Sequence, residues 1–366
     1  NTTGSSNNAL GYGALGANTT ANSNVAIGHV ALGANTTGTA NVAVGAEALD
    51  ANTTASNNVA VGKATLGANT TGEQNTAVGS KALDANTTAD SNTAVGYDAA
   101  TALTTGGYNV ALGDSALKAS TTGVNNVAIG YQTLNNSTDK FANTAIGYRA
   151  CKNNNSNYGV FIGDRSAANG IVSGEKNVAV GHYTLYSLTT GAYNTALGAN
   201  ALSGNTTASV NTAIGYNALG VNSTGTYNVA IGANALDANT TANNNIAVGY
   251  NAMTANTTGA SNTALGSSAL AASNGSSNVA VGDVSLYANT TGSNNTAVGT
   301  YSLYSNTTAS NNTAVGYDAL GDCTTGFSNV AVGHNAMNAL TDADENTAVG
   351  KDALGALTTG NYNTAI

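Results

Sequence analysis

The hydrophobic residues of this chain follow one short pattern, in which apolar and small residues alternate over five positions. It is first complete at residues 24–28, which read Asn-Val-Ala-Ile-Gly, and it returns at residues 41–45 and 58–62 as Asn-Val-Ala-Val-Gly. Its glycine recurs every 17 residues from Gly11 to Gly350, apart from three intervals of 16, 18 and 16 residues. A period of this size, sustained from end to end, is typical of a solenoid whose repeats stack on one another.

Each repeat, numbered from its asparagine, has the consensus Asn-(Val/Thr)-Ala-(Val/Ile/Leu)-Gly-x-x-Ala-Leu-x-Ala-Asn-Thr-Thr-Gly-x-x. The alternation at positions 1–5 has the period of a strand, and Gly or Asn interrupts every window long enough for a stable helix. We expect two short strands per coil, near positions 1–5 and 7–11. The sequence therefore predicts an all-β parallel β-solenoid of about 22 coils, continuous over residues 1–366, with irregular coils at about 148–177.

The aliphatic positions of the repeat predict a core. Positions 2 and 4 share one side of a strand, and position 4 is always aliphatic, so we expect that side to face inward with the Leu of position 9. The small Ala of position 3 is then expected to face a neighbouring surface, and Val180→Asp to break the rod. Cys151 occupies a Leu position and is interpreted as a small buried apolar residue. The predicted core includes Val25, Ile27, Leu32, Val44, Leu49, Val61 and Leu66.

The asparagine at position 1 is present in 21 of 22 copies. Stacked copies of one polar residue predict an asparagine ladder, in which each amide bonds to the coils above and below. Alternatively, each asparagine caps its own turn, and the two roles are compatible. The predicted ladder includes Asn24, Asn41, Asn58, Asn75 and Asn92.

The Asn-Thr-Thr triplet at positions 12–14 is expected to form columns on the surface. Each triplet satisfies the Asn-x-Thr rule for N-glycosylation, while the alternative is a hydrogen-bonded turn on a polar surface. An ice-binding threonine array is less favoured, because two consecutive threonines cannot share one strand face. The candidate glycosylation sites are Asn18, Asn35, Asn52, Asn69, Asn86, Asn239 and Asn289.

Residues 140–176 are the most irregular region, and they hold five of the nine basic residues of the chain. They also lose the ladder asparagine at residues 158–163, which read Tyr-Gly-Val-Phe-Ile-Gly. One interpretation is a coil with displaced turns, and the other is a contact site for a partner or neighbouring subunit. The candidate contact residues are Lys140, Arg149, Lys152, Phe161 and Arg165.

Composition limits the possible functions. Only 7 % of residues are charged, with 9 basic against 18 acidic, so nucleic acid is not an expected partner. No apolar run approaches the ~20 residues that span a bilayer. The three histidines all occupy position 6, many coils apart, and no nucleophile with its base, phosphate loop or metal-ligand spacing is present. We expect neither enzymatic activity nor a metal or cofactor.

The repeat resembles the head repeats of trimeric autotransporter adhesins of the YadA type, and the related repeats of phage tail fibres. Those families repeat a Ser-Val-Ala-Ile-Gly-like strand, which residues 24–28 and 126–130 match closely. The resemblance covers essentially the whole chain. It implies a left-handed parallel β-roll, three chains side by side, and a place on a cell or virion surface, with positions 2 and 4 filling the roll and Ala facing the trimer axis. The period differs, since the adhesin heads use a shorter repeat without the Asn-Thr-Thr-Gly turn.

These observations favour a structural segment of an extracellular fibre that partners copies of itself, as a side-by-side trimer or a head-to-tail filament. The alternative is a surface adhesin or tail-fibre shaft that binds a host surface or glycan, and a less favoured one is an ice-binding protein. The chain lacks an initiating Met and a signal pattern, and both ends stop within a repeat. We therefore expect it to be a window on a longer fibre.

Overall fold

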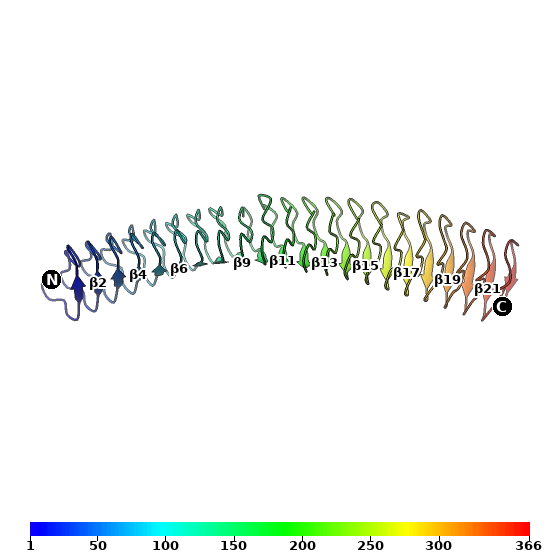
Figure 1. Cartoon of the computed structure of the whole chain (residues 1–366), viewed down its shortest axis with the longest axis horizontal. Helices are drawn as coiled ribbons and strands as arrows, with labels where there is room; N and C mark the ends of the chain where they lie inside the picture. Colours follow the sequence, from blue (N-terminus) through cyan, green and yellow to red (C-terminus); the bar gives the residue numbers. More distant parts are fainter. The chain divides into compact units, whose positions relative to one another are not determined.

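The chain folds into stacked coils that contain strands and turns and no helix. The computed structural model describes residues 1–366, and it divides them into two compact units, Asn1–Val178 and Ala179–Ile366. In each unit the strands are short arrows that lie side by side in parallel (Figure 1). The predicted all-β parallel solenoid with a 17-residue repeat is confirmed. Its handedness, and its continuity as one solenoid over residues 1–366, stay predictions.

The strands occupy positions 2–4 of the repeat, one in each coil. Those of the first unit are β1 (Asn8–Leu10), β2 (Val25–Ile27), β3 (Val42–Val44), β4 (Val59–Val61), β5 (Thr76–Val78), β6 (Thr93–Val95), β7 (Val110–Leu112), β8 (Val127–Ile129), β9 (Thr144–Ile146) and β10 (Val160–Ile162). Then follow β11 (Val178–Val180), β12 (Thr195–Leu197), β13 (Thr212–Ile214), β14 (Val229–Ile231), β15 (Ile246–Val248), β16 (Thr263–Leu265), β17 (Val279–Val281), β18 (Thr296–Val298), β19 (Thr313–Val315), β20 (Val330–Val332), β21 (Thr347–Val349) and β22 (Thr364–Ala365).

Successive coils pair in register, so that each residue meets its equivalent in the next repeat. In β3 and β4, Val42 pairs with Val59 and Ala43 with Ala60. Where each strand begins, a backbone hydrogen bond joins it to the next coil, for example from Val42 N–H to Asn58 O at 2.8 Å. Each residue type therefore forms a column along its unit.

The second strand predicted near positions 7–11 is absent, and turns fill this part of the coil. Positions 7 and 9 both adopt left-handed backbone angles, as Val30 (φ 57°) and Leu32 (φ 52°) illustrate. Left-handed residues reverse the local path of the chain and interrupt an extended strand. Backbone bonds between coils continue through the turn all the same, such as Leu32 N–H to Ala48 O at 3.0 Å.

The inward and outward faces of the strand are the reverse of those predicted. Ala26, Ala43 and Ala60 at position 3 are completely buried, whereas the aliphatic residues of positions 2 and 4 are half-buried or exposed. The reason is the asparagine of position 1, which is buried and bonded inside the coil. Side chains alternate along a strand, so an inward position 1 places position 3 inside and positions 2 and 4 outside.

Part of the predicted core is therefore wrong. Leu32, Leu49 and Leu66 at position 9 are fully buried, as expected, and they pack inside with the alanines of positions 3 and 8. The other predicted core residues point outward; they are Val25, Val44 and Val61, which are half-buried, and Ile27, which is 40 % exposed. Val180 is also only half-buried, so the premise behind the expectation that Val180→Asp breaks the rod, an inward position 4, is wrong as well.

The glycine of position 5 is required by a close approach between coils. At Gly62 the φ angle is 140°, and an added Cβ would lie 2.7 Å from the carbonyl carbon and oxygen of Gly79. Real Cβ atoms do not come this close to a neighbouring backbone, and φ values of this kind strain any residue with a side chain. This glycine lets the strand end directly against the next coil.

The coil at β10 departs from the consensus in two residues that compensate each other. Gly159 replaces the asparagine of position 1, and Phe161 replaces the alanine of position 3 and is completely buried. A Cβ on Gly159 would overlap the Phe161 ring, at 2.7 Å from Cζ. The ring thus occupies interior space next to position 1, where other coils place the asparagine side chain.

Candidate functional site

The interior of the coil is held by two columns of asparagine. At position 1, Oδ1 of Asn41 accepts the backbone N–H of Asn58 at 3.0 Å, and Oδ1 of Asn58 accepts that of Asn75 at 2.9 Å. The side-chain amide of Asn58 donates to Gly72 O, the carbonyl of position 15, at 2.9 Å. The same carbonyl accepts from Asn69 of position 12, also at 2.9 Å. Two buried ladders thus share one carbonyl in each such coil.

The predicted asparagine ladder at position 1 is present in the structure. Its members lie wholly inside the coil and each contacts the neighbouring coil through the amide oxygen; they are Asn24, Asn41, Asn58, Asn75 and Asn92. Because buried backbone groups need hydrogen-bond partners, this column is a structural requirement of the fold.

The second ladder overturns the predicted glycosylation sites. All seven candidate asparagines are buried and bonded within the solenoid, so a folded coil has no room for a glycan on their amides. Asn52, for example, donates to Asn35 Oδ1 at 2.9 Å and to Ala55 O at 3.1 Å. The buried candidates are Asn18, Asn35, Asn52, Asn69, Asn86, Asn239 and Asn289.

The outer sheet face consists of the side chains at positions 2 and 4 of the strands. Position 4 is Val, Ile or Leu in every coil, and position 2 is nearly always Val or Thr. No strand carries a charged residue at either position. Leu112 in the first unit is 44 % exposed and Leu265 in the second is 48 % exposed. Each unit therefore presents a regular, uncharged surface of aliphatic and threonine side chains along its length.

The basic coils contain a cation–π cluster, formed by Arg149 and Arg165 with Tyr131 and Tyr148. The two tyrosine rings stack at 5.4 Å, and the guanidinium of Arg149 lies 5.1 Å from the Tyr148 ring and 5.9 Å from the Tyr131 ring. Arg165 lies 5.4 Å from the Tyr148 ring. Arg149 Nε also donates to Gln132 Oε1 at 3.2 Å. The structure thus brings two of the five predicted contact residues together.

The other three predicted contact residues lie elsewhere. Lys140 forms an ion pair with the adjacent Asp139 at 3.1 Å, and Lys152 is half-buried at position 10 of its coil. Phe161 is completely buried and cannot touch a partner, so its assignment to the contact site is wrong. Its aromatic ring fills the interior of the coil.

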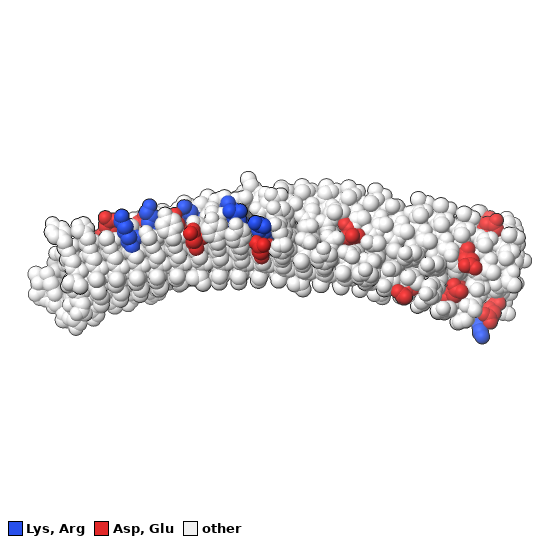
Figure 2. All heavy atoms as spheres, in the orientation of Figure 1, with Lys and Arg blue, Asp and Glu red and all other residues white.

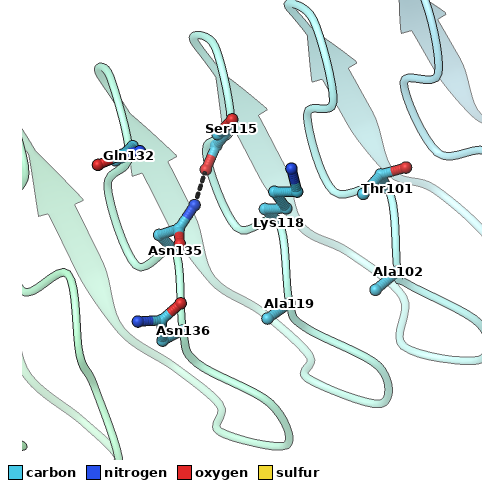
Figure 3. Close-up of a pocket in the computed structure, with 8 residues that line it drawn as sticks. All are labelled: Thr101, Ala102, Ser115, Lys118, Ala119, Gln132, Asn135 and Asn136. Atoms are coloured by element: carbon cyan, nitrogen blue, oxygen red, sulfur yellow. Dashed lines mark hydrogen bonds between the residues drawn. The ribbon is translucent and has the colours of Figure 1, made fainter.

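A hollow of about 410 Å³ lies on the first unit beside the cation–π cluster. Its wall comes from three successive coils, at positions 7, 10 and 11, and Figure 3 shows Lys118, Gln132, Asn135 and Asn136 around it. The remaining lining residues are Thr101, Ala102, Ser115 and Ala119. Gln132 lines this hollow and accepts a hydrogen bond from Arg149 of the cation–π cluster, which makes the two features neighbours.

Charge is distributed unevenly between the units. The first unit holds eight of the nine basic residues, and the second holds only Lys351. On the face seen in Figure 2, the basic side chains of the first unit follow one side of it, while the second unit displays mainly acidic ones. Nearly all basic residues of the chain thus lie in the unit that contains the hollow.

Both thiols are buried and inert. Burial raises the pKa of the Cys151 thiol well above its usual range and that of Cys323 to about 12. Cys151 fits its Leu position, as expected, and Cys323 takes a ladder position, where its Sγ donates to Gly326 O at 3.4 Å. No group of His, Cys, Asp and Glu side chains is placed to hold a metal ion. No helix long and apolar enough to cross a bilayer is formed.

The second asparagine ladder and the hollow were not predicted from the sequence. A signal for the ladder existed, because position 12 is replaced by Leu103, Leu188 and Cys323, and leucine and cysteine suit an interior better than a glycosylated surface. The sequence signal for the hollow is weaker. It consists of polar residues at position 10 of three successive coils, Thr101, Lys118 and Asn135. No model of a known protein family matches the chain, and no curated protein matches it in sequence.

Proposed function

We propose that this chain is a non-enzymatic structural segment of an extracellular fibre, whose copies pack side by side through their outer sheet faces. One observation carries the proposal: the columns at positions 2 and 4 are uncharged throughout each unit, and apart from Asn8 they contain only aliphatic residues and threonine. Contiguous exposed apolar surface on this scale is rare on monomeric proteins and marks interaction sites.

A second copy of the chain is the partner that fits this surface best. Strands repeat at about 4.8 Å along each unit, so only a partner with the same spacing can interlock with the columns over their full length. The same face on another copy has that spacing and no charge to desolvate. The resemblance to trimeric adhesin heads favours three copies and a cell or virion surface. It is the outer Val and Ile columns, and not the alanines, that would meet in such an assembly.

Charges on the outer face are expected to dissociate the assembly without unfolding the coils. The triple variant Ile27→Lys, Leu112→Lys and Leu265→Lys places two charges in the exposed position 4 column of the first unit and one in that of the second. Surface substitutions of this kind cost about 0.5 kcal/mol or less. Sedimentation equilibrium should give a mass that falls to the 35.7 kDa of one chain, with an unchanged unfolding transition.

The matched control puts three lysines on the exposed turn column at position 14, as Thr37→Lys, Thr122→Lys and Thr258→Lys. This variant should keep the mass of the unmodified protein. If both triple variants keep that mass, or both lose it, the outer sheet face is not the interface.

A surface adhesin that binds a host surface or glycan is the second candidate function. The cation–π cluster favours it, because two stacked tyrosines and two arginines on one patch are a common way to bind ligands. Arg149, Lys152 and Arg165 are the residues whose replacement by serine tests it, in the binding experiment described below.

Ice binding is the third and weakest candidate, and we expect no thermal hysteresis. The threonines of position 13 are occupied by bonds to the next coil, as with Thr36 Oγ1 to Thr53 O at 3.0 Å. On the outer face, position 2 alternates irregularly between Val and Thr, so its hydroxyls form no continuous array. Freezing-point measurements on the purified chain check this expectation. A gap between the freezing and melting temperatures would make ice binding the leading candidate function.

A further inference from the structure

We propose that the hollow lined by Lys118, Gln132, Asn135 and Asn136 binds a neutral saccharide of one or two rings. The inference deepens the second candidate function, since it gives that function a ligand class and a place, and it is independent of self-association. Its support comes from the shape of the hollow, the way its polar side chains are held, and its charge.

The size of the hollow suits a small polar molecule. Its volume of about 410 Å³ falls at the lower end of the ~300–1,000 Å³ that is usual for small-molecule sites. Ala102 and Ala119 contribute short apolar side chains, while amides and hydroxyls from three coils form the rest of the wall. A sugar ring has the same combination of small apolar patches and many hydroxyl groups.

Each of the four polar side chains is held in place by a hydrogen bond or ion pair to another residue of the chain. Lys118 Nζ is 2.7 Å from Asp98 Oδ2, and Asn135 Nδ2 donates to Ser115 O at 2.9 Å. This leaves further donors on Lys118 and both a donor and an acceptor on Asn135. Their positions are fixed before a ligand arrives, which lowers the entropy lost on binding.

The two remaining amides are held in the same manner. Gln132 Oε1 accepts from Arg149 Nε at 3.2 Å, which leaves both protons of its NH₂ group for a ligand. Asn136 Nδ2 donates to Asn153 Oδ1 at 2.6 Å, which leaves its own Oδ1 as an acceptor. The hollow therefore offers donors and acceptors together, and hydroxyl groups are the ligand groups that use both.

The charge of the hollow favours a neutral ligand. Its one cation, Lys118, is already paired with Asp98, so the pair carries no net charge. An anionic ligand would have to compete with that carboxylate. Several other coils have no polar side chain for a ligand at position 10. Glycine occupies it at Gly33, Gly67 and Gly321.

The test is a glycan array printed with neutral and acidic mono- and disaccharides, probed with the labelled full chain. We expect binding to neutral sugars, with an affinity that falls at least tenfold in the Gln132→Ala, Asn135→Ala double variant. The control is Asn338→Ala, which removes the amide at the same position of a coil in the second unit and should leave binding unchanged. Circular dichroism should show the same fold for all three proteins.

The outcomes separate the hollow from the wider adhesin function. One outcome is that the double variant still binds, whereas binding is lost in the triple variant Arg149→Ser, Lys152→Ser, Arg165→Ser. That outcome would overturn the saccharide site while the adhesin function stands. Binding confined to acidic sugars would also overturn it. Binding to no sugar on the array would remove the saccharide proposal together with the glycan-binding form of the adhesin function.

Discussion

Replacement of Phe161 by alanine is expected to destabilise the first unit by about 3–5 kcal/mol, the usual cost of removing a buried phenylalanine ring. Phe161 is completely buried and lies against Gly159, which has no side chain to take its place. The variant leaves an empty space that no other coil contains. Urea unfolding followed by circular dichroism measures the loss.

A second substitution is expected to restore most of this stability. In the double variant Gly159→Asn, Phe161→Ala, residues 159–163 read Asn-Val-Ala-Ile-Gly, the same as residues 24–28 and 126–130. The new asparagine then enters the ladder above Asn143, whose Oδ1 already accepts the Gly159 N–H at 2.9 Å. Stability should return to within about 1 kcal/mol of the unmodified chain. Gly159→Asn alone should destabilise, because its side chain overlaps the ring. If the double variant is no more stable than Phe161→Ala, the asparagine side chain does not replace the phenylalanine ring inside this coil.

Replacement of Asn58 by leucine is expected to cost about 2–5 kcal/mol. The variant removes the acceptor of the Asn75 N–H, bonded at 2.9 Å, and one donor to Gly72 O, also at 2.9 Å. A buried donor left without a partner costs roughly 1–3 kcal/mol, and the branched side chain adds a similar overpacking cost. The same urea experiment measures it, and unfolding should begin in the coils around β4 and β5.

The matched control is Asn69→Leu, which changes the other ladder of the same coil. Leucine already occupies position 12 at Leu103, Leu188 and Leu340, where it is completely buried. Asn86, which loses its bond to Asn69, keeps a bond to Ala89 O at 3.2 Å. We expect a cost of about 1 kcal/mol or less, within the range of well-tolerated core changes. Equal costs for the two variants would mean that the position 1 ladder has no special role.

The period of the repeat made the architecture predictable, and the alternation within it made the strand predictable. Neither could say which face of the strand points inward, because a period of two is satisfied by both choices. Hydrophobicity favoured Val and Ile inside, whereas the buried backbone carbonyls of positions such as Gly38 and Gly72 require Asn inside. The need to satisfy buried polar groups determined the outcome. The left-handed residues at positions 7 and 9 gave no signal, since Val30 and Leu32 are residue types that rarely adopt that geometry.

The candidate site was only partly predictable. The excess of basic residues near 140–176 drew attention to Arg149 and Arg165. Arg149 directly follows Tyr148 in the chain, whereas Arg165 reaches the same ring from the next coil, across the 16-residue interval from Gly147 to Gly163. The hollow next to them depends on side chains from three coils, and on which of these point outward from the turn. Sequence spacing alone does not define that direction when the backbone is left-handed.

The mass of the unmodified chain in solution is the most direct test of the central claim, that the outer sheet faces of separate copies pack together. Sedimentation equilibrium at several concentrations measures it. We expect a whole-number multiple of 35.7 kDa, and three copies if the resemblance to trimeric adhesin heads extends to assembly. A folded chain that stays at 35.7 kDa over the whole concentration range would contradict it.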